Sequence, residues 1–104
     1  MPEPSDTPST TPNILAEAEK AVYGPRQSAY GHPRENFERT ARLWNGYLFA
    51  CKGDDSPLLT ATDVAQMMVL LKMARLMQTP DHRDSVVDMA GYTATYARVV
   101  GLDA

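Results

Sequence analysis

The sequence predicts an all-α fold, a small helical bundle of about four helices. Apolar residues recur at helical spacing in four segments, and capping or helix-breaking residues stand at the segment ends. No segment shows the alternation of apolar and polar residues that is typical of a half-buried strand. We therefore expect one all-α domain over residues 13–104, preceded by a disordered tail over residues 1–12 that holds four of the eight prolines.

The first two helices follow from local signals. The first is predicted over residues 13–22, with Asn13 as the N-cap and Gly24-Pro25 as its stop. The second is predicted over residues 34–51 and starts after His32-Pro33. Its apolar face combines four side chains at helical spacing, Phe37, Ala41, Trp44 and Leu48.

The third and fourth helices carry clearer end signals. Residues 60–63 (TATD) form a capping-box-like start for a helix over 61–78, which is apolar on almost every side and is expected to be central and buried. The fourth is predicted over residues 82–100 and ends at Gly101. An apolar central helix in so short a chain leaves more apolar surface than three neighbours can cover, which predicts a homodimer or a higher oligomer.

Composition excludes several classes of function. Ten Lys and Arg against thirteen Asp and Glu give a net charge of -3, so no non-specific nucleic-acid partner is expected. The chain shows no secretory signal and no window of about 20 apolar residues, so we expect a cytoplasmic protein with no membrane partner. Because Cys51 is the single cysteine, any metal is expected to have oxygen ligands.

Two cations and two acids mark the third and fourth predicted helices. Lys72 and Arg75 are three residues apart, and Asp84 and Asp88 four, so each pair lies on one helix face. The cations could neutralise phosphate and the acids could hold Mg²⁺. The structural alternative is that both cations reach the surface or that Asp88 pairs with one of them in an ion network.

A second group of candidates surrounds the predicted start of the second helix. Tyr30 could stack on a base, and His32 or Asn36 could read its edge at a helix N-terminus that favours anions. Alternatively, Tyr30 is a packing residue and His32 caps the helix. Gly91, inside the fourth helix, costs about 1 kcal/mol relative to alanine, which indicates a close neighbour or a ligand there.

Three segments together carry a resemblance to a known family. The segments AYGHPRENFERTARLW, DVAQMMVLLKMARL and PDHRDSVVDMAGY resemble a small all-α domain of unknown function that is common in phages and prophages, particularly those of actinobacteria. More distantly, the chain is similar to phage nucleotide-modification-associated domains and to MazG-like all-α NTP pyrophosphatases. It departs from the pyrophosphatases in having neither their E-x-x-E nor their E-x-x-D motif on a buried face.

The resemblance implies a nucleotide-binding protein, with Mg²⁺-dependent hydrolysis of a nucleoside triphosphate as its associated activity. It implies Asp84, Asp88 and Lys72 as catalytic residues and Glu35, Asp84 and Asp88 as metal ligands. The implied substrate-binding residues are Tyr30, Gly31, His32, Asn36, Lys72, Arg75 and Tyr92. Two alternatives stay open: a protein that sequesters nucleotides without catalysis, and a helical adaptor that binds a host protein.

Overall fold

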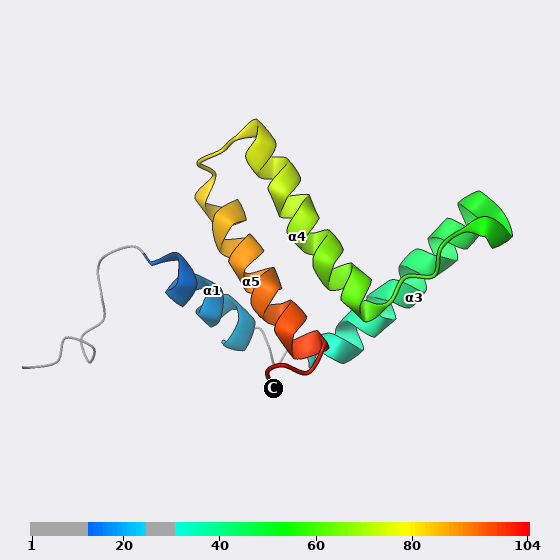
Figure 1. Cartoon of the computed structure of the whole chain (residues 1–104), viewed down its shortest axis with the longest axis horizontal. Helices are drawn as coiled ribbons and strands as arrows, with labels where there is room; N and C mark the ends of the chain where they lie inside the picture. The colour runs from blue at the N-terminus through cyan, green and yellow to red at the C-terminus, as the bar shows by residue number, and fades with distance from the viewer. Residues whose placement is uncertain (1–12, 25–30) are drawn as a thin grey trace, which may run out of the picture.

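The computed structural model describes residues 13–24 and 31–104 and shows a helical chain (Figure 1). The elements are α1 (Ile14–Tyr23), α3 (Pro33–Lys52), the short 3-10 helix η2 (Gly53–Asp55), α4 (Ala61–Gln78) and α5 (Arg83–Val99). The described residues contain no strand, so the predicted all-α fold is confirmed. The predicted tail over 1–12 lies outside them. None of the described helices is long and apolar enough to cross a membrane.

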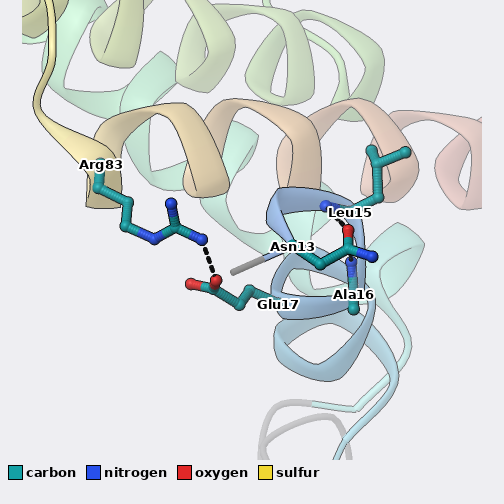
Figure 2. A network of polar contacts seen from close by, with 5 residues as sticks. All are labelled: Asn13, Leu15, Ala16, Glu17 and Arg83. Atoms are coloured by element: carbon teal, nitrogen blue, oxygen red, sulfur yellow. Dashed lines mark hydrogen bonds and ion pairs between the residues drawn. The ribbon is translucent and has the colours of Figure 1, made fainter. Parts of the chain in front are cut away.

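Side-chain caps begin α1 and α4 where the sequence predicts them. The Asn13 Oδ1 atom accepts the backbone N–H groups of Leu15 and Ala16, at 3.1 and 3.2 Å (Figure 2). At the start of α4, Thr60 Oγ1 accepts the Asp63 N–H, and an oxygen of Asp63 accepts the Thr60 N–H at 2.9 Å. This reciprocal pair is a capping box, which satisfies backbone donors that a helix start leaves unpaired.

The end of α5 is also the one predicted. Gly101 has a φ of +88°, in the left-handed region that favours glycine. The Leu102 N–H donates to the carbonyl oxygen of Ala97 at 2.8 Å, and the Gly101 N–H donates to the carbonyl oxygen of Arg98 at 3.4 Å. These two bonds form a Schellman motif, which ends the helix and turns the chain back toward the start of α3.

The central helix of the fold is α5, so the prediction that the helix over 61–78 is central is wrong. α5 packs against α1, α3 and α4, whereas α4 packs chiefly along α5 and near its own start against α3 (Figure 1). Only Ala61, Val64 and Ala65 are buried in α4. A helix that is apolar on almost every side needs neighbours on almost every side, and the described part of this chain covers mainly the side of α4 that faces α5.

α1 lies along α5 and is held there mainly by packing. Ala18 and Val22 are its buried residues. An exposed ion pair joins Glu17 of α1 to Arg83 at the start of α5 (Figure 2). The hydrogen bond from Arg83 lowers the pKa of the Glu17 carboxyl. Because exposed ion pairs contribute little to stability, this pair adds little to the burial of Ala18 and Val22.

The second half of α3 extends away from the other helices (Figure 1). Ala41 is the last buried residue of this helix, and we call residues 42–52 the α3 arm. The returning chain is tied to the arm at Asn45, whose amide donates to the Leu59 carbonyl at 3.0 Å and accepts the Leu59 N–H at 2.8 Å. The arm therefore supports the connection to α4, but no other α-helix covers it.

Candidate functional site

A pocket of about 500 Å³ lies where α1, α3, α4 and α5 meet. This volume falls within the usual range for small-molecule sites, roughly 300–1,000 Å³. Its polar lining comes mainly from α5, which is the helix that touches all the others. The lining residues are Ala21, Val22, Gly31, Pro33, Asn36, Phe37, Lys72, Val87, Asp88, Gly91, Tyr92, Thr95 and Arg98.

An ion pair crosses the pocket from α4 to α5. The Lys72 Nζ atom lies 3.0 Å from an Asp88 oxygen, and the side chains are 11% and 42% exposed, respectively. Lys72 stands on the side of α4 that faces α5, which explains how a lysine comes to be buried in an otherwise apolar helix. The structural alternative for Asp88, an ion pair with Lys72 across the bundle, is confirmed. Because the carboxylate is half-exposed, one of its oxygens can meet solvent or a ligand.

Arg98 is a pocket residue that the sequence analysis missed. Its side chain is 7% exposed, and its Nε atom donates to the Ala104 carbonyl at 3.0 Å. Its guanidinium also donates to the Val22 carbonyl at 3.4 Å and lies 4.9 Å from the centre of the Tyr23 ring. Arg98 therefore joins α5 to α1 and places a second buried cation at the pocket.

A sequence signal for Arg98 was present. Asp84, Asp88, Gly91 and Thr95 follow one another at steps of four, three and four residues and form a stripe on one face of α5, and Arg98 continues this stripe at the next helical step. The structure places the last four of these five residues on the pocket wall. Extending the stripe by one further turn would have identified this arginine.

The start of α3 supplies the rest of the polar lining. Gly31, with a φ of +76°, turns the chain into the helix, and Pro33 is buried at the first helical position. Asn36 and Phe37 follow on the side that faces the pocket. This end of the site therefore offers one amide and one aromatic ring beside a helix N-terminus, which favours negative charge.

His32 has a structural role at this point. Its Nδ1 atom accepts the Arg34 N–H at 3.0 Å, so the side chain caps α3. Its Nε2 atom lies 3.1 Å from the Ala104 carbonyl oxygen. The capping alternative predicted for His32 is confirmed, and the side chain is not among the pocket lining.

Three other predicted site residues stay outside the pocket lining. Arg75 is exposed and is not part of the pocket lining. Glu35 is exposed on α3, and Asp84 is exposed one turn before Asp88 at the start of α5. Tyr30 lies outside the described residues. Asp88 is therefore the one predicted metal ligand on this wall, and the described part of the chain contains no group of three His, Cys, Asp or Glu side chains arranged to hold a metal.

Substituting Gly91 tests whether the wall of the pocket lies close to a bound molecule. An added Cβ atom would meet Val22 Cγ2 at 3.5 Å, which is ordinary van der Waals contact. We therefore expect Gly91→Ala to raise the free energy of unfolding, by up to about 1 kcal/mol, because alanine is the better helix former. The same methyl group enters the pocket, so the variant should bind a ligand there more weakly. Urea unfolding and ligand titration measure the two effects separately, and a large loss of stability would contradict the expected fit.

Comparisons with known proteins give the relatives of this chain. The family described as "Domain of unknown function (DUF6378)" matches residues 13–100. The "Gene 55 protein" of Mycobacterium phage D29 is 44% identical over 87 residues, which cover 84% of this chain and 53% of that protein. The "Gene 55 protein" of Mycobacterium phage L5 is 41% identical over 87 residues, with 84% and 52% covered. The chain thus spans about half the length of these relatives, and no solved structure matches it.

Proposed function

This chain belongs to the DUF6378 family, with relatives encoded by phages, and we propose that its pocket binds a nucleotide or a related phosphorylated molecule. The predicted resemblance to a small phage domain is thereby confirmed. The more distant resemblance to MazG-like pyrophosphatases stays a prediction.

The charge of the pocket lining is the observation that carries the proposal. Among the described lining residues, Lys72 and Arg98 are cations and Asp88 is the one acidic side chain, whereas the whole chain has a net charge of -3. Both cations are largely buried, where weak screening by solvent strengthens their attraction for an anion. A phosphate is an anion that such a cluster attracts strongly.

The remaining lining supports a nucleotide among phosphorylated ligands. Phe37 and Tyr92 present aromatic rings, on which a base can stack. Asn36 adds an amide that can both donate and accept hydrogen bonds at a base edge. The pocket therefore has cations for the phosphate of a nucleotide and aromatic and amide side chains for its base.

The site supports binding better than hydrolysis. The predicted ligands Glu35, Asp84 and Asp88 do not come together, so a metal held by three protein carboxylates does not fit these residues. We keep Mg²⁺ as a proposed co-ligand that arrives with the phosphates, since Mg²⁺ commonly takes one or two protein carboxylates and fills its shell with water and phosphate oxygens. Asp88 is the carboxylate available for that role.

The proposal is tested by adding a panel of nucleoside mono-, di- and triphosphates to the protein, with and without Mg²⁺. We expect at least one nucleotide to raise Tm, with a stabilisation of about 2.7 kcal/mol at a concentration of 100 times its Kd. Chromatography of the same mixtures shows whether the nucleotide stays intact. If no nucleotide changes Tm and none is retained, the adaptor alternative takes the place of this proposal.

Asp88 and Asp84 form a matched pair of variants for the role of the carboxylate. Without Mg²⁺, we expect Asp88→Asn to keep or strengthen nucleotide binding, because a carboxylate that competes for Lys72 is neutralised. Any gain in affinity that Mg²⁺ gives the parent should be lost in this variant. Asp84→Asn should change neither the affinity without Mg²⁺ nor the gain in affinity from Mg²⁺, since Asp84 is exposed and outside the lining. Calorimetric titration measures the affinities, and equal effects of the two substitutions would contradict the assignment of Asp88 to the site.

A further inference from the structure

Beyond the pocket, the α3 arm is an apolar helix segment that its own protomer leaves uncovered. Leu43, Tyr47 and Phe49 are all exposed, with Tyr47 at 70%. No residue of α3 after Ala41 is buried. An isolated helix of this length is marginally stable in water, and helices in proteins gain most of their stability from packing. The α3 arm therefore needs a neighbour that the protomer does not supply.

The outward side of α4 carries a second uncovered apolar surface, which has a regular spacing. Met67, Leu70, Ala74 and Met77 follow one another at steps of three, four and three residues, and we call them the α4 seam. All four are exposed, with Leu70 at 58% and Met77 at 82%. This is the spacing by which two helices pack along a shared stripe.

The positions beside the α4 seam carry no charge, since Leu71 and Met73 are apolar and Gln66 and Gln78 are neutral amides. Leu71 and Met73 flank it and are exposed, in places where two-stranded coiled coils usually carry charges. The three charged residues of α4 have other positions: Asp63 caps the helix, Lys72 faces α5, and Arg75 lies off the seam. A charge-free stripe of this width suits another apolar helix surface.

We propose that a second copy of this chain covers the α4 seam and the α3 arm, so that the protein is a homodimer through this surface. The exposed apolar side chains of the two segments present on the order of 1,000 Å², compared with about 800 Å² per partner in a stable interface. This summed apolar area is larger than the few hundred Å² of a typical exposed patch on a monomer. A symmetric dimer pairs the same surface with itself, and the evenly spaced, uncharged seam is complementary to its own copy.

The molecular mass in solution and two glutamate variants test whether a second copy covers this surface. Light scattering with size-exclusion chromatography, at micromolar concentration, should give twice the chain mass of 11.5 kDa. Leu70→Glu and Tyr47→Glu should each give a monomer that keeps its helical circular dichroism, because both side chains are exposed in the protomer. Leu15→Glu is the matched control and should stay dimeric, since Leu15 is equally exposed but lies on α1.

Cys51 allows a second measurement that needs no substitution. It is the single cysteine, it is exposed, and it lies on the α3 arm. A spin label on Cys51 should therefore show dipolar coupling between the two copies, and Leu70→Glu should abolish that coupling. A parent chain that is monomeric and shows no coupling overturns the proposal, whether or not the patch then binds a vesicle or a host protein. A dimer that survives both glutamate substitutions overturns the assignment of this surface.

Discussion

Replacing Lys72 by methionine is expected to remove about half or more of the stabilisation by nucleotide while leaving the ligand-free protein about as stable as the parent. The Lys72 ammonium is the largely buried cation that α4 brings to the pocket. Removing it takes away a charge for phosphate binding, so we expect affinity to fall at least about tenfold, the equivalent of about 1.4 kcal/mol. The ligand-free protein loses the ion pair, but the Asp88 carboxylate that stays behind is 42% exposed and can be hydrated, so the cost to stability is expected to be small.

Melting curves with and without nucleotide measure both effects of the Lys72 substitution. Lys52→Met is the matched control, because Lys52 is exposed at the end of α3 and lies outside the pocket lining. It should melt and bind like the parent protein. If Lys72→Met instead lowers Tm strongly and leaves the nucleotide shift intact, the ion pair is structural and the ligand binds elsewhere.

Replacing Arg98 by leucine is expected to cause the largest loss of stability, about 3 kcal/mol or more. The substitution leaves the Val22 and Ala104 carbonyls without the arginine donor, and it removes the cation that lies over the Tyr23 ring. Each of these contacts joins α5 to another part of the fold. The free energy of unfolding from urea denaturation measures the loss.

Arg98→Lys separates the charge of this residue from its geometry. Lysine keeps the positive charge but has no planar fork of donors, so it cannot reproduce bonds to two separate carbonyls. We expect it to recover only part of the lost stability. Full recovery by lysine would show that charge alone matters at this position, and a leucine variant as stable as the parent would show that the contacts are dispensable.

The helix ends could be predicted from the sequence because their causes are local. Asn13, the pair Thr60 and Asp63, and Gly101 each act on backbone groups within a few residues, and the structure confirms all of them. The helix bounds accordingly differ from those predicted by no more than one residue at either end. Local hydrogen bonding decides where these helices begin and end.

The arrangement of the helices depends on distant contacts, which is why its prediction failed in part. The apolar composition of α4 indicates that the helix needs to be buried, but it does not indicate which segment or partner buries it. Only three residues of α4 are buried within this chain. For the site, spacing along one helix correctly placed Asp84 and Asp88 on one face of α5. It could not show that Arg75 and Asp84 lie beyond the reach of the pocket, because that depends on where the neighbouring helices cross.

The attachment of α1 to α5 has a consequence for the order of folding. α4 and α5 are joined by a short connection and can pair early, whereas Glu17 must find Arg83 across 66 residues of chain. Contacts between distant segments form slowly because the intervening loop must first close. Since Ala21 and Val22 of α1 form one wall of the pocket, the pocket is completed only when α1 docks. Ligand binding during refolding should therefore report the last cooperative step, and exchange of the α1 amides should reveal the first segment to open.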